Sequence, residues 1–270
     1  MQIDREIITI ITMDERLELM IRCALESGKI QRKYYQKRFG IRHKGEINLV
    51  TDVDIACQAR ILDLIKGRYP DDDIIAEEKV NRYDGKAGRW IVDPLDGTTN
   101  YAHGYPFFCT SIAYEESGII EYGVVYNPIF KELFTCKKGE GAYLNNRKIS
   151  VSNVTILKNA LLSTGFPYDL PTSGNNNINH FIKFLYRAQA IRRDGSAALN
   201  LSYVACGRFD GFWELRLNPW DTAAGCLMVE EAGGAVSNFS GRPFNIYEDD
   251  IVASNGNVHA ALLGVLQEER

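Results

Sequence analysis

The chain has 270 residues, 45% of them hydrophobic and 24% charged, so it can bury a large core and is not expected to be disordered. Its formal net charge is -4, and its basic residues form no run longer than a pair, which argues against nonspecific nucleic-acid binding. No segment resembles a signal peptide or a membrane span, and the six cysteines form no CxxC pair, so we expect a reduced, cytoplasmic chain.

Two helices are expected first. Thr12–Glu15 has the T-x-x-E form of a capping box, and apolar residues then recur at helical spacing to about Phe39. A second helix is predicted to begin at Thr51–Asp54, to carry Ile55 on its apolar face, and to end around 67–70. These patterns predict an α-helical N-terminal layer.

Strand patterns follow the two helices. Turn signals join three predicted strands into an antiparallel meander, and the rest of the chain alternates strands with helices. The predicted strands are 73–78, 89–92, 108–114, 119–126, 132–136, 160–164, 209–214, 234–238 and 251–254. The later helices are predicted near 178–189, 196–206, 221–231 and 257–268. This order predicts an α/β fold of packed layers.

The stretch DPLDGTTN, from Asp93 to Asn100, carries the most chemistry. Pro-x-Asp-Gly is also a common turn sequence. However, Asp93 and Asp96 follow a buried strand, where two carboxylates are costly unless a cation such as Mg²⁺ neutralises them. Gly97 and Thr98 then begin a helical turn whose backbone N–H groups can bind an anion. We therefore expect metal ligands beside a phosphate site.

Other carboxylates stand at strand ends and helix starts. Glu77 and Glu78 follow a predicted strand, and Asp221 follows Pro219-Trp220. Taken singly, the two glutamates fit a solvated strand end, and Asp221, like Asp54, fits a helix cap. Taken together, strand-end carboxylates in an α/β chain favour a common site.

These motifs resemble the signatures of the inositol monophosphatase family in order and spacing, and most resemble its bacterial SuhB-type inositol-1-monophosphatases. The resemblance extends from about Lys44 to the C-terminus. The matching segments are Trp90–Asn100, Trp220–Gly225, Glu231–Gly234, Glu77–Glu78, Gly195–Ala198 and Phe212–Glu214.

The resemblance implies an α/β/α/β/α sandwich of the inositol monophosphatase and fructose bisphosphatase type. The whole chain, 1–270, would form one unit, with subdomains 1–150 for metal and phosphate and 151–270 for the substrate side. It implies Mg²⁺-dependent hydrolysis of inositol 1-phosphate to myo-inositol and phosphate through a metal-activated water. It further implies sensitivity to lithium and a homodimer, with the apolar segment 101–108 forming part of the interface.

The resemblance also assigns roles to residues. The metal ligands would be Glu77, Asp93, the carbonyl of Leu95, Asp96 and Asp221. The catalytic residues would be Glu77, Thr98 and Asp93, of which Glu77 and Thr98 position and deprotonate the attacking water while Glu78 lies behind them. The substrate-binding residues would be Asp96, the amides of Gly97 and Thr98, Ala197, Glu214 and Asp221. Lys44 lies in a segment like the family's mobile loop, and Asp54 follows it as an acid near the metals.

Alternative functions remain open at this point. The same scaffold serves fructose-1,6-bisphosphatases, and Arg192 and Arg193 could pair with a second phosphate as well as being surface charges. Phe166 stands where some relatives have a small polar residue near the sugar, which leaves a substrate other than an inositol phosphate open. The sequence shows no adenine-stacking feature, which argues against removal of the 3'-phosphate from an adenosine bisphosphate. A macromolecule-binding regulatory role on the same fold is the alternative from another class. The four histidines are scattered and are interpreted as surface or structural groups.

Overall fold

The computed structural model describes residues 14–37, 41–43, 49–78, 88–167 and 176–268. The helices are α2 (Glu15–Tyr34), α3 (Asp52–Arg68), α4 (Thr98–Ala102), α5 (Ile178–Leu185), α6 (Ala197–Ala205), α7 (Pro219–Glu231) and α8 (His259–Leu266), with a 3₁₀ turn, η1 (Leu157–Asn159). Strands of the first half are β1 (Ile41–His43), β2 (Leu49–Thr51), β3 (Asp73–Ala76), β4 (Gly88–Asp96), β5 (Cys109–Glu116), β6 (Ile119–Asn127), β7 (Glu132–Lys137), β8 (Gly141–Leu144) and β9 (Arg147–Lys148). Those of the second half are β10 (Leu161–Thr164), β11 (Ala190–Arg192), β12 (Gly211–Leu215), β13 (Ala235–Ser237) and β14 (Asp250–Ser254).

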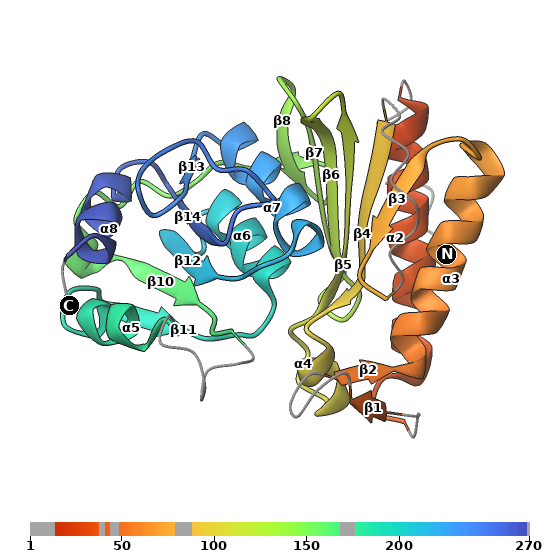
Figure 1. Ribbon diagram of the computed structural model, residues 1–270, viewed down its shortest axis with the longest axis horizontal. Helices are drawn as coiled ribbons and strands as arrows, with labels where there is room; N and C mark the ends of the chain where they lie inside the picture. Colours follow the sequence, from red (N-terminus) through yellow and green to blue (C-terminus); the bar gives the residue numbers. More distant parts are fainter. Residues whose placement is uncertain (1–13, 38–40, 44–48, 79–87, 168–175, 269–270) are drawn as a thin grey trace.

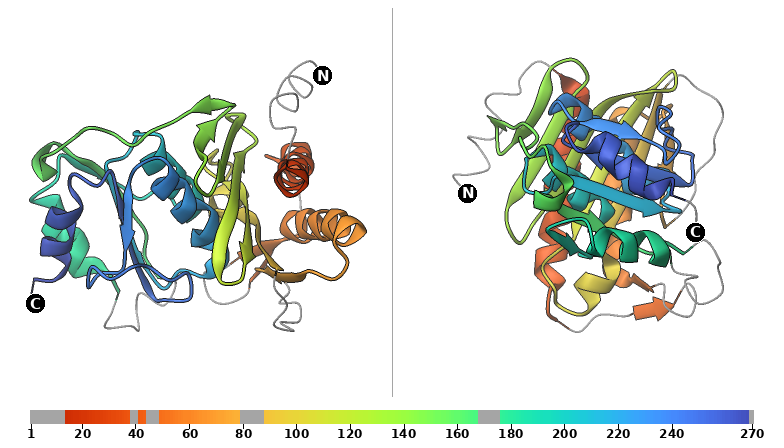
Figure 2. Two further views of the ribbon diagram at one scale, coloured as in Figure 1. Left: turned by 90° about the horizontal axis from the view of Figure 1, so that it is seen from above. Right: turned by 90° about the vertical axis from the view of Figure 1, so that its left-hand side faces the viewer.

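The elements form five layers, as Figures 1 and 2 show. Helices α2 and α3 cover one face of a seven-stranded sheet of order β3-β4-β5-β6-β7-β8-β9. Helices α6 and α7 lie between that sheet and a five-stranded sheet of order β11-β10-β12-β14-β13, whose outer face is covered by α5 and α8. The predicted α/β/α/β/α sandwich is confirmed. The division into subdomains at residue 150 stays a prediction.

Alternation along β4 explains how the seven-stranded sheet serves two cores. Trp90 and Val92 pack against α2 and α3, whereas Ile91 between them packs toward α6 and α7. Successive side chains of a strand point to opposite faces, so a strand that is apolar at every position is covered on both sides. This parity also fixes which way the acids at the end of β4 point.

The two N-terminal helices begin at side-chain caps. Asp14 accepts hydrogen bonds from the first turn of α2, and Thr51 forms a capping box with Asp54 at the start of α3. The cap predicted at Thr12 lies outside the described residues, and α2 ends at Tyr34 rather than near Phe39. Placing Ile55 on the buried face of α3 was wrong, because that side chain is 44% exposed.

Sheet pairing overrides helical periodicity after α5. The helix predicted to reach residue 189 ends at Leu185, and the edge strand β11 follows it, parallel to β10. The backbone N–H of Gln189 donates to the carbonyl of Ala160 at 3.0 Å, which draws the chain onto the sheet. That partner lies far away in the sequence, so a local pattern could not predict the strand.

The segment 101–108, expected to form part of a dimer interface, contributes three of its aromatic side chains to the core. Tyr101, Phe107 and Phe108 are buried, whereas Tyr105 is exposed. All six cysteines are free, as predicted. Within the described ranges, no helix has the length and apolarity needed to cross a bilayer.

Candidate active site

An extra residue in β4 turns two aspartates toward the same side of the sheet. Asp93 pairs with Ser111 of β5 and Asp96 with Cys109, so three steps along β4 match two along β5. In a regular strand, residues three apart point to opposite faces. Because of the bulge, the two aspartate side chains point to the same face. Pro94, which has no backbone N–H, fits at this position because a bulged residue need not donate a ladder hydrogen bond.

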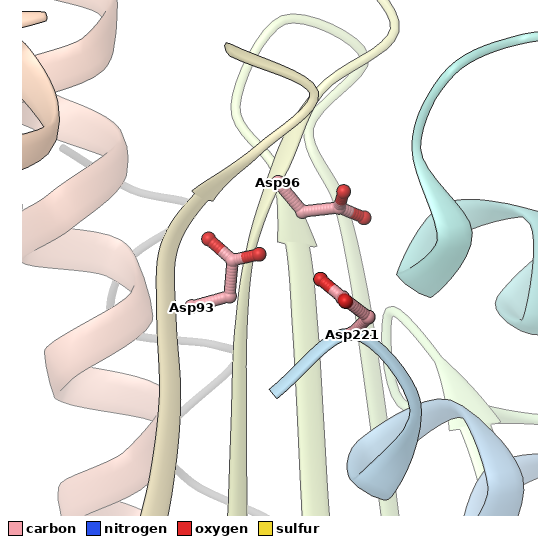
Figure 3. Close-up of side chains that lie close together, drawn as sticks. All are labelled: Asp93, Asp96 and Asp221. Carbon is pink, nitrogen blue, oxygen red and sulfur yellow. The ribbon is translucent and has the colours of Figure 1, made fainter. Parts of the chain in front are cut away.

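Asp221 joins this pair from the first turn of α7. Ligand oxygens of Asp93, Asp96 and Asp221 all lie within 4.8 Å of one another, and Figure 3 shows the three carboxyl groups facing a common space. The chain therefore brings together acids that are 128 positions apart in sequence, counted from Asp93 to Asp221.

Hydrogen bonds fix one oxygen of each of these three carboxyl groups. Asp93 accepts from the backbone N–H of Leu95 at 2.9 Å, and Asp221 accepts from that of Asn218 at 2.7 Å. Asp96 accepts from Ser196 Oγ at 2.6 Å and from the N–H of Ala198 at 2.8 Å. The carboxyl groups are thus held in place before any ligand arrives, as a metal site requires.

Burial and mutual repulsion raise the pKa values of these acids. Burial, followed by the charges of Glu77, Asp96 and Asp221, raises the pKa of Asp93 well above its ordinary value. Burial is also the main cause that raises the pKa of Asp96 to about 6 and that of Asp221 to about 8. A cluster of oxygen donors whose ionised forms repel one another matches what a hard divalent cation needs. The donor set therefore fits Mg²⁺.

Thr98 stands between the cluster and a buried acid. Its hydroxyl lies 2.9 Å from Asp54 Oδ1 and 3.1 Å from the carbonyl of Leu95. Asp54 itself is fully buried and accepts from the backbone N–H of Thr51 at 2.9 Å. Asp54 thus acts on Thr98, in addition to capping α3.

The predicted site residues line one cavity of about 600 Å³. It contains every residue that the resemblance assigned to metal, catalysis or substrate: Glu77, Asp93, Leu95, Asp96, Gly97, Thr98, Ala197, Glu214 and Asp221. Glu78 is not among the lining residues; its backbone N–H donates to Gln58 Oε1 at 3.0 Å. Lys44 lies outside the described residues. Neither His103, His180 nor His259 lines this cavity.

Two glycines at this cavity let the backbone lie close to neighbouring groups of the protein. Gly97 has a φ of +92°, and a Cβ there would lie 2.9 Å from the carbonyl oxygen of Phe107. A Cβ on Gly165 would overlap the carboxylate of Glu214. Both positions therefore require glycine, one for its conformation and one for space.

Glu214 lines the same cavity as Asp93. Burial, followed by the charges of Asp221 and Asp96, raises its pKa to about 8. The neighbouring Trp213 donates from Nε1 to Asn177 Oδ1 at 2.7 Å, and Asn177 Nδ2 donates to the carbonyl of Gly165 at 2.7 Å. This buried network ties β12, which carries Glu214, to Gly165 just after β10.

The sequence did not show which of Arg192 and Arg193 lines the cavity. It also did not identify all the residues that line it. Arg193 lines the cavity, whereas Arg192 does not and donates to the carbonyl of Ile191. The lining residues to which the sequence assigned no role are Thr99, Asn100, Gly165, Pro167, Gly195, Ser196, Leu215, Arg216, Leu217, Asn218 and Trp220. Arg216 has a φ of +58°, a conformation that no sequence pattern announced.

Residues 12–270 match the model of the inositol monophosphatase family. An inositol-1-monophosphatase of Synechocystis sp. is 43% identical over 91% of this chain and 86% of its own length. The Nus factor SuhB of Escherichia coli strain K12 is 41% identical over 95% of this chain and 97% of its own length. The crystal structure of extragenic suppressor protein suhB from Bartonella henselae superposes with a TM-score of 0.90 at 37% identity, covering 95% of this chain and all of that one.

The layered fold and the carboxylate-lined cavity are those of a phosphatase-type protein. The chain belongs to the inositol monophosphatase family.

Proposed function

We propose that this protein hydrolyses phosphate monoesters with the help of Mg²⁺, and that its substrate is inositol 1-phosphate. The observation that carries the proposal is the convergence of Asp93, Asp96 and Asp221 within 4.8 Å at a cavity large enough for a sugar phosphate. Membership of the inositol monophosphatase family and the name of the Synechocystis relative support the choice of substrate.

The carboxylates of Glu77, Asp93, Asp96 and Asp221 and the carbonyl of Leu95 would hold the metal. All five line the cavity, and hydrogen bonds hold three of the carboxyl groups in place. When bound, Mg²⁺ supplies positive charge that draws in the ester, promotes ionisation of the attacking water and stabilises the departing alkoxide.

The chain's own groups place the reactants. The Thr98 hydroxyl donates to Asp54, so its oxygen can accept a hydrogen bond from a water beside Glu77. Glu77 and Thr98 would hold that water, and the carboxylate of Glu77 would receive its proton. The backbone N–H groups of Gly97 and Thr98 would bind phosphate oxygens. Glu214 and the N-terminus of α6 at Ala197 would bind the polyol.

A phosphate-release assay tests this proposal. The substrates are inositol phosphates, fructose 1,6-bisphosphate and adenosine 3',5'-bisphosphate, each with Mg²⁺ and with EDTA, and with LiCl as a further arm. We expect Mg²⁺-dependent release from inositol 1-phosphate and its loss in Asp93→Asn. Asp210→Asn is the matched control, because Asp210 is a buried, hydrogen-bonded carboxylate outside the cavity. Unchanged turnover in Asp93→Asn would refute the proposal.

A second candidate activity is hydrolysis of a sugar bisphosphate. Arg193 and Arg216 both line the cavity, and guanidinium groups suit a second phosphate. The measurement that separates the two activities is kcat/KM for fructose 1,6-bisphosphate against inositol 1-phosphate, in the wild type and in Arg193→Met. A fall confined to the bisphosphate would favour this second activity.

A binding function beside catalysis is favoured by the relative named Nus factor SuhB. Pull-down with wild type and Asp93→Asn would show whether a macromolecular partner exists and depends on the site.

We also propose a homodimer and a cytoplasmic location. A monomer by light scattering would contradict the homodimer, and cell fractionation tests the location.

A further inference from the structure

The carbonyl oxygen of Pro94, inside the β4 bulge, receives hydrogen bonds from three side chains. Gln31 Nε2 donates at 2.9 Å, Thr110 Oγ1 at 3.1 Å and Ser27 Oγ at 3.3 Å. Gln31 Nε2 also donates to Thr110 Oγ1 at 2.9 Å, and the two hydroxyl oxygens lie 2.7 Å apart. We call Ser27, Gln31 and Thr110 the Pro94 donor group.

The Pro94 donor group lies on the α2 side of the sheet, away from the cavity. Ser27 and Gln31 are four positions apart and so share one face of α2, while Thr110 points to them from β5. All three side chains are 0% exposed. None of them lines the cavity, so none can reach a substrate.

Gln31 is poorly suited to its position as a packing residue. In the part of the chain that the structure describes, its Oε1 has no hydrogen-bond partner although it is buried. A buried acceptor without a partner destabilises the fold, whereas an apolar side chain of similar length would fill the space without that cost. What Gln31 contributes is therefore the pair of hydrogen bonds that its Nε2 donates.

One peptide group connects the donor group with the carboxylate cluster. The carbonyl of Pro94 and the N–H of Leu95 belong to the same planar unit and point in opposite directions. The carbonyl faces the donor group, and the N–H donates to Asp93 Oδ1 at 2.9 Å. Fixing the carbonyl therefore fixes the direction of the hydrogen bond that orients Asp93, and polarisation along this chain of bonds strengthens it.

We propose that Gln31, together with Thr110 and Ser27, is a positioning residue for the metal site: it holds the Pro94-Leu95 peptide so that Asp93 points correctly. This inference rests on the proposed function, since it assumes that Mg²⁺ binds these groups. The helix α2, which supplies no cavity-lining residue, thereby takes part in the site.

Titration of the full-length protein with MgCl₂ by isothermal calorimetry tests the proposal. Gln31→Met removes both donated hydrogen bonds and keeps the length of the side chain. The matched control is Asn255→Leu, because Asn255 is also buried and donates to a carbonyl and to a hydroxyl, Val154 O and Ser152 Oγ, both at 2.8 Å, away from the cavity. Asp93→Asn tests the metal site itself, and melting in EDTA reports the cost to the fold.

Gln31→Met is expected to weaken Mg²⁺ binding about tenfold, while Asn255→Leu stays within about twofold of the wild type. Raising Mg²⁺ should then restore most of the kcat of Gln31→Met. Equal Mg²⁺ affinity of the wild type and Gln31→Met, with binding lost in Asp93→Asn, would overturn this proposal alone. Mg²⁺ binding retained in Asp93→Asn would overturn the proposed metal site. If Gln31→Met does not fold, Thr110→Val, which keeps the shape of threonine, decides in the same way.

Discussion

The substitution Asp221→Asn removes a buried, repelled charge from the carboxylate cluster and keeps the side chain's hydrogen bonds. Asp221 Oδ2 accepts a hydrogen bond from the backbone N–H of Asn218 at 2.7 Å, and an asparagine side-chain oxygen can accept the same bond. The variant therefore keeps the cap at the start of α7 and loses the negative charge. In the absence of metal, we expect it to be more stable than the wild type at alkaline pH.

The size of this effect follows from the pKa of Asp221. Burial, followed by the charge of Asp96, raises it from 3.8 to about 8. One pKa unit corresponds to about 1.4 kcal/mol, so ionised Asp221 destabilises the fold by roughly 6 kcal/mol. Asparagine gives up as much as about 1 kcal/mol of interaction with the α7 dipole, which leaves a net gain of roughly 5 kcal/mol.

The pH dependence has a definite sign. Between pH 3.8 and about 8, the folded protein retains a proton on Asp221 that the unfolded chain has released. The free energy of unfolding therefore falls as the pH rises through this interval, and the loss is complete above it. Asp221→Asn removes this component of the pH dependence.

Thermal unfolding followed by circular dichroism, in EDTA at pH 5, 7 and 8.5, measures the effect. At pH 8.5 the melting temperature of Asp221→Asn should exceed that of the wild type by about 8 °C, with a smaller difference at pH 5. Added Mg²⁺ should reverse the order by stabilising the wild type. Asp210→Asn, away from the cluster, should not gain stability at any pH. An Asp221→Asn protein no more stable than the wild type at pH 8.5 would refute the argument that burial and repulsion make ionised Asp221 destabilising.

Three other substitutions test separate parts of the structure. Gly165→Ala adds a methyl group that displaces Glu214, so KM for inositol 1-phosphate should rise about tenfold while Mg²⁺ affinity measured by calorimetry does not change. Thr98→Val should lower kcat about a hundredfold in steady-state assays, with activity largely recovered in Thr98→Ser. Gly123→Ala places a Cβ 2.9 Å from the carbonyl of Ala224, where β6 meets α7, and should cost about 1 to 3 kcal/mol in urea unfolding.

Local sequence signals predicted most of the layers and the acids of the carboxylate cluster. Thr51 caps α3 through contacts within four residues, and the apolar run ending at Asp93 forms a strand covered on both sides. Such features depend on neighbours in the chain, so their patterns can be read directly. The family resemblance supplied the pairing of Asp93 with Asp221, which no local pattern contains.

The parts that the sequence did not predict depend on contacts between distant segments. β11 forms because Gln189 meets Ala160 at a sheet edge, and Gln31 bonds to Pro94 across 63 positions. A glutamine within a helix is usually a surface residue, so nothing in its local pattern marks it as a partner of the bulge. Its burial beside a backbone carbonyl became visible only in three dimensions.

The acidic cluster spans a junction between layers. Asp93 and Asp96 belong to the seven-stranded sheet, whereas Asp221 belongs to the helix packed between the two sheets. An ion shared by these side chains would act as a cross-link across the junction. By thermodynamic linkage, the free energy by which the bound ion stabilises the contact between the layers equals the binding free energy that the ion loses when this contact is broken. Substitutions that loosen the packing of α7, even far from the cavity, should therefore weaken binding of the ion, because this helix carries one of its ligands.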